Sequence, residues 1–201
     1  SLSHHGVLFL DEFPEFNPQV LDSLRQPMET GDCMIARANH RITYPARFQL
    51  IAAMNPCRCG RAGEPGFTCL RGPRCQSDYQ ARISGPLMDR IDLRVDVPAV
   101  TSADLIRPHK PETSAEVAAR VARARDLQRT RFAAAGLHML STNAQCSPSM
   151  IESIAEPDAA GLKLLSDASE HLKLSARAYH RILKVARTLA DLDGEARVGR
   201  I

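Results

Sequence analysis

The sequence predicts an α/β chain in which part of a parallel sheet is followed by a small all-helical domain. Two short, continuous apolar runs, residues 6–10 and 48–54, are typical of strands buried on both faces of a parallel sheet. A helical apolar pattern lies between them, and beyond residue 113 the composition changes to Ala-, Arg- and Glu-rich helical segments. We therefore expect an α/β unit over residues 1–97, a Pro-bearing linker over 98–112 and a helical unit over 113–201.

In the α/β unit, one helix is expected after the first strand. Asn17 and Pro18 suit its N-cap and first position, and Gly31 suits its end. Residues 33–44 alternate loosely around a polar tip, which predicts a β-hairpin. A further strand is expected over 91–97. Residues 57–76 are rich in Gly, Pro, Arg and Cys without periodicity, which predicts an insertion loop.

The helical unit is predicted to contain helices over 114–135, 148–156, 158–171 and 175–192. Ser175 suits the N-cap of the last helix. Near-helical apolar spacing predicts which faces pack inward. In the first helix these positions are Val117, Val121, Ala124 and Leu127, and in the last they are Ala178, Ile182, Val185, Ala186 and Leu189.

The composition argues against a membrane-spanning or secreted protein and leaves a nucleic-acid partner open. The net charge of +3 is too small to indicate a nucleic-acid partner by itself, although residues 33–92 carry nine arginines against four acids. No stretch approaches the ~20 apolar residues that span a bilayer, and no secretory signal opens the chain. We expect a cytoplasmic protein without a membrane partner, in which clustered cysteines favour metal ligation over disulfides.

Polar side chains follow both predicted parallel strands. Asp11 and Glu12 end the first strand, and Asn55 ends the second. Adjacent carboxylates at a strand end are the arrangement with which P-loop NTPases hold Mg²⁺ and polarise the attacking water. The alternative is ordinary strand ends entering loops, with Asn55 starting a turn before Pro56.

Four of the six cysteines lie in the predicted insertion loop, in the pattern Cys57-x-Cys59-x₉-Cys69-x₅-Cys75. Four thiolates can hold a tetrahedral Zn²⁺, which would order a loop that has no core of its own. Four protein ligands leave no open position, so such a zinc would be structural. The alternative is a mobile loop with reduced cysteines, because the spacing departs from the common paired form.

Two arginines and the hairpin tip are further candidates. Arg90 lies just before the strand predicted at 91–97 and could reach a neighbouring subunit's nucleotide, or simply pair with Asp89 or Asp92. Arg177, near the start of the last helix, could reach a phosphate or be solvated. The hairpin tip, with Arg37, Asn39, His40 and Arg41, is a candidate for salt-sensitive DNA contact, against the alternative of a solvated surface.

Four segments together resemble a known family. Residues 6–12 (GVLFLDE), 53–57 (AMNPC), 82–92 (RISGPLMDRID) and 175–183 (SARAYHRIL) look like the magnesium-chelatase-like AAA+ ATPases, in their competence-protein (ComM/YifB) branch. The likeness runs over essentially the whole chain. The cysteine cluster is similar to the ComM branch and favours it over the chelatase subunit proper.

The resemblance implies a partial AAA+ P-loop-type sheet core followed by a helical lid, with ATP and Mg²⁺ as ligands. It implies that Asp11 and Glu12 are the Walker B pair and that Asn55 is sensor 1. Arg90 would be a trans-acting arginine finger and Arg177 the sensor 2 arginine. The hairpin would be a pre-sensor 1 hairpin, which lines the pore in related ring ATPases.

No G-x-x-x-x-G-K-[ST] motif occurs in the 201 residues, so the phosphate-cradling Walker A loop is missing. We expect a segment of a longer ATP-dependent ring motor, hexameric and acting on DNA by branch migration or as a helicase. Alone, the segment is expected to be inactive and to self-associate through an open sheet. The alternatives are the magnesium chelatase motor subunit and a non-catalytic, zinc-stabilised nucleic-acid-binding module.

Overall fold

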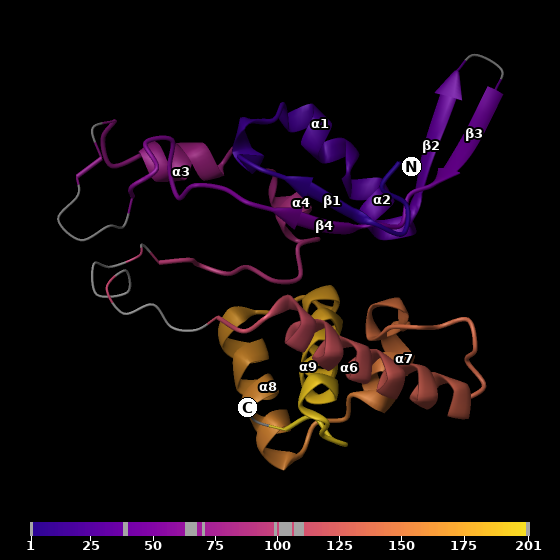
Figure 1. Cartoon of the computed structure of the whole chain (residues 1–201). Helices are drawn as coiled ribbons and strands as arrows, with labels where there is room; N and C mark the ends of the chain where they lie inside the picture. Colours follow the sequence, from indigo (N-terminus) through magenta and orange to yellow (C-terminus); the bar gives the residue numbers. More distant parts are fainter. Residues whose placement is uncertain are drawn as a thin grey trace. The chain divides into compact units, whose positions relative to one another are not determined.

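The computed structural model describes residues 2–37, 40–62, 68–69, 71–98, 100, 106 and 111–199. By its internal contacts the chain divides into two compact units, Ser1–Ala99 and Val100–Ile201. The first unit holds the strands and the second is helical (Figure 1). The small parallel sheet and the helical C-terminal region agree with the predicted fold class.

The parallel sheet of the first unit consists of β1 (Val7–Leu10) and β4 (Gln49–Ala52). They pair in parallel with Leu8 opposite Leu50 and Leu10 opposite Ala52. The connection runs through the 3₁₀ helix η1 (Phe13–Glu15), two short helices and a hairpin. Both predicted strands are therefore confirmed as a parallel pair, with their carboxyl ends at the same edge.

The helix predicted between the strands is present but broken in two. It forms α1 (Pro18–Ser23) and α2 (Arg25–Thr30). The predicted cap is confirmed, because the Asn17 side chain accepts a hydrogen bond from the backbone N–H of Gln19. Pro27 explains the break: it has no N–H to donate to residue 23, and its ring crowds that carbonyl. Gly31 ends α2 in the left-handed conformation, at φ 76°.

The predicted hairpin is confirmed as β2 (Asp32–Arg37) paired antiparallel with β3 (His40–Pro45). Arg37 pairs with His40 at the tip, while Asp32 pairs with Pro45 at the base. Residues 38–39 lie outside the described part of the chain. The hairpin's base is fixed to the end of α2, because the Ala46 N–H donates to the Gly31 carbonyl at 2.7 Å.

The core of the first unit lies on one side of the sheet. It comprises Phe13, Leu21, Ile83 and Leu87, the last in α4 (Gly85–Met88). The other face is open, and the prediction that both strands are buried on both faces is wrong. Side chains of Val7, Phe9 and Ile51 are 54%, 59% and 43% exposed. With two strands, the described residues supply no layer to cover this face.

The strand predicted over residues 91–97 is not formed. These residues carry no regular structure, and Leu93, Val95 and Val97 are 67%, 81% and 85% exposed. Apolar alternation alone does not make a strand, because a strand needs a neighbour for its backbone hydrogen bonds. Most of the linker predicted over 98–112 lies outside the described residues.

All four predicted helices of the second unit are confirmed. They are α6 (Ser114–Ala134), α7 (Pro148–Ile154), α8 (Ala159–Leu172) and α9 (Ala176–Asp193), with a 3₁₀ helix η2 (Asn143–Gln145) between α6 and α7. Side-chain caps explain their starts: Thr113 forms a capping box with Glu116, and Ser175 accepts from the N–H of Ala178. Local chemistry thus sets these boundaries.

The buried faces of α6 and α9 agree with the predicted ones only in part, since Ala124 is buried and Ala186 packs against the core. In α9 the buried side chains are Leu183, Arg187, Ala190 and Asp191, whereas Ile182 and Leu189 are 39% and 44% exposed. The apolar pattern misled because Arg187 and Asp191 bury an ion pair that neutralises both charges. In α6 the buried residues are Ala124, Gln128 and Phe132, and Val117, Val121 and Leu127 are largely exposed.

The core of the helical unit draws on every helix. Its buried residues are Phe132, Cys146, Ile151, Ala155, Leu165, Leu183, Ala190 and Val198. Among the described residues, no helix has the length and apolar character to cross a membrane.

Candidate functional site

Asp11, Glu12 and Asn55 lie at one edge of the sheet, where β1 and β4 both end. Backbone hydrogen bonds continue the pairing beyond the strands, since the Phe13 N–H donates to the Ala53 carbonyl at 3.0 Å. All three candidate side chains are exposed. The structure therefore brings two carboxylates and an amide to one accessible edge, as ligand sites of parallel sheets require.

Glu12 has an unusual backbone conformation. Its φ of 50° and ψ of 45° place it in the left-handed region, which is costly for a residue with a Cβ. Its N–H donates to the Asp11 carboxylate at 2.8 Å. The left-handed backbone at Glu12 interrupts the extended conformation of β1 directly after the strand. One carboxylate can then hold a cation while its neighbour orients a water molecule.

The four loop cysteines form one cluster. The sulfur atoms all lie within 4.8 Å of one another, with 2.8 Å between those of Cys57 and Cys59 and 3.0 Å between those of Cys59 and Cys69. Cys57 and Cys75 are buried and all four are free thiols. Zinc with Zn–S bonds of about 2.3 Å needs sulfur atoms about 3.8 Å apart, so changes of about 1 Å or less in these separations would complete a tetrahedral site.

The thiols of this cluster perturb one another's ionisation. The hydrogen bond from the Cys59 thiol lowers the pKa of Cys57 to about 6, because it stabilises the Cys57 thiolate. Hydrogen bonds with Cys57 and Cys69 raise the pKa of Cys59 to about 12. The cluster thus favours thiolate formation at one position even before a cation arrives, and thiolate is the form that binds metal.

Glu15 links the cysteine loop to the turn that follows the carboxylates. Its carboxylate lies 2.9 Å from Arg82 Nη1 and 3.6 Å from Arg58 Nε. Desolvation opposes ionisation of Glu15, but the hydrogen bonds and positive charges of Arg82 and Arg58 together outweigh it and lower the pKa of Glu15. Sequence reasoning missed this residue, because no local spacing connects Glu15 with Arg82.

Arg90 is held within its own unit. Its side chain is only 13% exposed and forms an ion pair with Glu29 in α2. Its Nη1 also donates to the Pro86 carbonyl at 2.7 Å. This ion pair joins residues 61 positions apart in the sequence, and the local pairing with Asp89 or Asp92 stays a prediction. Glu29 was also missed, since the sequence gives no sign of that contact.

The other candidates lie on exposed surfaces. His40 and Arg41 are exposed at the start of β3, beside the tip of the hairpin. The backbone of Arg37 pairs with His40, and Asn39 lies outside the described residues. Arg177 is exposed in the first turn of α9.

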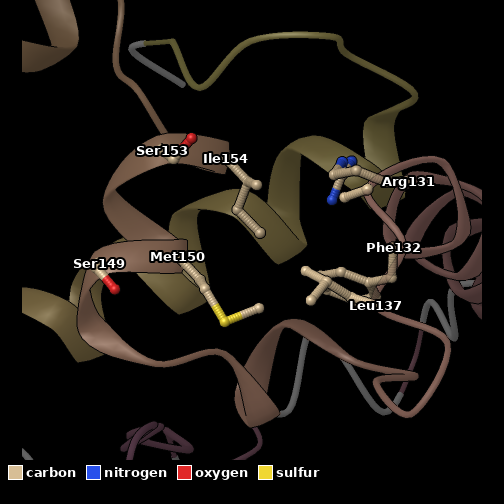
Figure 2. A pocket seen from close by; sticks show the side chains of 8 residues that line it. Arg131, Phe132, Leu137, Ser149, Met150, Ser153 and Ile154 are labelled. Atoms are coloured by element: carbon tan, nitrogen blue, oxygen red, sulfur yellow. The ribbon is translucent and has the colours of Figure 1, made fainter.

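A hollow of about 290 Å³ lies in the helical unit. Figure 2 shows the side chains of Phe132, Leu137, Met150 and Ile154 converging on it. Arg131 at its rim donates to Asp191 and is already paired. None of the predicted site residues lines this hollow, so it adds no support to the candidate site.

Comparison with known proteins identifies the family. The family model described as magnesium chelatase, subunit ChlI, matches residues 1–105. The model of the ChlI C-terminal region matches residues 111–201. The chain belongs to the magnesium chelatase ChlI family. This family is of the AAA+ ATPase class, and the small parallel sheet with its helical unit agrees with a partial AAA+ fold.

The relatives narrow the assignment to one branch. Competence protein ComM of Haemophilus influenzae is 44% identical over 199 residues, which are 98% of this chain and 37% of that protein. YifB of Escherichia coli is 41% identical over 194 residues, 96% of this chain and 37% of that protein. The chain thus fits the ComM/YifB branch and spans little more than a third of these relatives' length.

A more distant likeness covers part of the chain. The DNA replication licensing factor Mcm6 of Anopheles gambiae is 30% identical over 92 residues, which are 46% of this chain and 10% of that protein.

Proposed function

We propose that this chain supplies the C-terminal part of the ATPase module of a ring-forming motor that acts on DNA. Residues 1–97 would belong to the nucleotide-binding core, and residues 113–201 would form its helical lid. The observation that carries the proposal is the shared edge of β1 and β4, where Asp11, Glu12 and Asn55 meet. Membership of the family supports it.

In this proposal each residue at the edge has a separate task. Asp11 holds the hydrated Mg²⁺ that accompanies ATP, and the ion supplies positive charge beside the phosphates. Glu12 accepts a hydrogen bond from the attacking water and orients it toward the γ-phosphate. Asn55 donates from its amide to the same water or to a γ-phosphate oxygen. The left-handed backbone at Glu12 supports a functional role, because such strain in a residue with a Cβ is typical of active sites.

Two arginines complete the nucleotide site in the proposal. Arg90 acts on the nucleotide of a neighbouring subunit, where a guanidinium stabilises charge on the transferring phosphoryl group. Arg177, in the first turn of α9, contacts the γ-phosphate from the lid. Since hydrolysis then needs residues of two subunits, the proposal requires a homo-oligomeric ring, which we take to be hexameric.

We further propose a structural zinc at Cys57, Cys59, Cys69 and Cys75. The close sulfur atoms and the buried positions of Cys57 and Cys75 support it. Bound zinc would supply the cohesion that the loop lacks, and four thiolate ligands fill its coordination. Glu15, Arg58 and Arg82 would then connect the ordered loop to the turn carrying Glu12.

DNA is proposed as the substrate on which the motor moves. The exposed cations His40 and Arg41 lie beside the hairpin tip, which suits sequence-independent phosphate contact. Two of the similar proteins, a competence protein and a DNA replication licensing factor, have names that agree with action on DNA. Branch migration in natural transformation or recombination is the activity that we propose.

Mixed rings provide a sharp test. In the full-length protein, Glu12→Gln and Arg90→Ala are each expected to lower ATP turnover at least about 100-fold. Mixing the two variants should restore part of the turnover, because some interfaces combine the intact Glu12 of one subunit with the intact Arg90 of its neighbour. Branched DNA should stimulate the wild type. Unchanged turnover in either variant, or mixtures without any recovery, would refute these roles.

Two other functions make different predictions. A magnesium chelatase motor subunit, as the matched family is described, would drive metal insertion into a porphyrin and would show no stimulation by branched DNA. A non-catalytic binding module would show salt-dependent DNA binding by this chain alone and no effect of Glu12→Gln. Without a P-loop, we expect this chain alone to hydrolyse no ATP.

A further inference from the structure

Arg90 is held where it cannot reach another subunit without first leaving its present contacts. The side chain is 13% exposed, its Nη2 pairs with Glu29, and its Nη1 donates to the Pro86 carbonyl. Its Nε is buried without a hydrogen-bond partner among the described residues. A guanidinium in this state is held chiefly by one carboxylate and incompletely satisfied otherwise. It is therefore poised to exchange this partner for another.

Glu29 lies at the junction between this arginine and the hairpin. It is the next-to-last residue of α2, and β2 begins three positions later at Asp32. The junction is short and tight: a Cβ added at Gly31 would approach Arg47 Cγ to 2.7 Å, and the Gly31 carbonyl accepts from Ala46. A displacement of the hairpin therefore carries the end of α2 with it.

Space for such a movement exists beside the ion pair. A hollow of about 500 Å³ is lined by Glu29 and Arg90 together with Cys33 and Met34 at the start of β2. Close-packed interiors transmit a shift as a whole, whereas an open hollow lets one element rotate without rebuilding its neighbours. The hairpin root can thus swing while α4, which carries Leu87 into the core, stays fixed.

We propose that Glu29 is the positioning residue for Arg90: it retains the arginine on its own subunit until DNA displaces the hairpin, which withdraws Glu29 and frees Arg90 for the neighbour's nucleotide. This inference rests on the proposed function of Arg90. It adds a partner for that arginine and a route by which DNA stimulates hydrolysis. Breaking the pair leaves the mostly buried guanidinium without a counter-charge, which drives it outward.

The test compares ATP turnover of the full-length protein with and without DNA in Glu29→Gln. Loss of a charged hydrogen-bond partner is expected to raise DNA-free turnover about tenfold, and added DNA should then stimulate it less than about twofold. Glu112→Gln is the matched control, because it removes the exposed carboxylate that pairs with Arg120 in the helical unit. The control should keep both the wild-type turnover and its DNA response.

A charge-swapped variant, Glu29→Arg with Arg90→Glu, separates the two proposals. It rebuilds the ion pair but places no arginine at position 90, so turnover should stay as low as in Arg90→Ala. Recovery of wild-type turnover in the swap would mean that Arg90 is only a structural partner, and both proposals would fall. If Arg90→Ala abolishes turnover while Glu29→Gln lowers it or keeps the wild-type DNA response, only the role of Glu29 is overturned.

Discussion

The two units of this chain differ in how many residues each buries in its own core. The helical unit buries eight residues in one cluster and adds an internal polar network around Asp191. The first unit buries four residues in its cluster and leaves Phe9 and Ile51 exposed on the open face of its sheet. The candidate chemistry lies in the less complete unit. The candidate site thus lies in the unit that leaves more of its apolar surface exposed among the described residues.

The largest effect should come from breaking the polar network of the helical unit. Asp191→Ala removes the carboxylate that pairs with Arg187 and accepts from Asn143 at 2.8 Å. Arg187 is 1% exposed and would keep a buried, uncompensated charge. We expect a loss of about 3–5 kcal/mol in the free energy of unfolding. Urea unfolding followed by helical circular dichroism measures it, with the exposed Asp193→Ala as control.

The same network predicts how stability responds to acid. Burial opposes ionisation of Asp191, but hydrogen bonds from Arg131 and Asn143 outweigh it and hold its pKa below the usual 3.8. A carboxyl group whose pKa is lower in the folded than in the unfolded state stabilises the fold at pH values above its unfolded-state pKa. That stability is lost as the pH falls through the folded-state pKa. The wild type should therefore lose stability below about pH 4, and Asp191→Asn should flatten that dependence. Parallel pH profiles for both proteins would contradict this account.

Paired core substitutions sharpen the comparison between the units. Leu183 is 2% exposed, and Leu183→Ala should cost about 2–5 kcal/mol of unfolding free energy. Phe9 is 59% exposed, so Phe9→Ser should cost less than about 1 kcal/mol in this chain.

Phe9→Ser should also reduce self-association of the chain, which sedimentation velocity measures, because it removes a large side chain from the open apolar face. A large stability loss in Phe9→Ser, or a monodisperse wild-type monomer, would show that the first unit is more complete than its open face indicates.

Removing the proposed zinc is expected to affect the cysteine loop and to leave the helices largely unchanged. Purified protein should contain about one zinc per chain, and Cys57→Ser should lose it whereas Cys33→Ser, outside the cluster, should retain it. Chelation should expose the loop to trypsin at Arg58 and Arg61 and change the helical signal little. Equal metal content in both serine variants, or none in the wild type, argues against the zinc site.

The smallest predicted effect concerns the hairpin tip. Arg41→Ala in the full-length protein should weaken DNA binding for all sequences and reduce the slope of log affinity against log salt by about 1. Arg123→Ala, an exposed arginine on α6, provides the comparison. Fluorescence anisotropy over a salt series measures both. If DNA affinity and its salt dependence changed equally in the two variants, the hairpin tip would not be a DNA contact.

Elements fixed by local chemistry could be predicted from the sequence. The caps at Asn17 and Ser175 and the closing Gly31 of α2 mark helix ends with residues a few positions apart. The edge that carries Asp11 and Asn55 was also predictable, because strand ends of parallel neighbours coincide. Alternation in β2 and β3 located the hairpin in the same way.

Features that depend on distant partners could not be predicted in this way. Residues 91–97 alternate like a strand but have no neighbour to pair with in the described structure. Glu15 and Glu29 gain their roles from arginines 67 and 61 residues away. Arg187 and Asp191 look like a solvated helix face until their mutual neutralisation is seen. The partners of Glu15 and Glu29 are distant in the sequence, and the burial of the i,i+4 pair Arg187–Asp191 depends on the packing around α9, so the residue types alone predict neither.

The measurement that tests the central claim most directly compares ATP binding with ATP turnover in the Glu12→Gln variant of the full-length protein. If Glu12 orients the attacking water, turnover should fall at least about 100-fold while the affinity for ATP stays within about twofold of wild type. Turnover equal to wild type would contradict the account, since the carboxylate at the end of β1 would then have no part in hydrolysis.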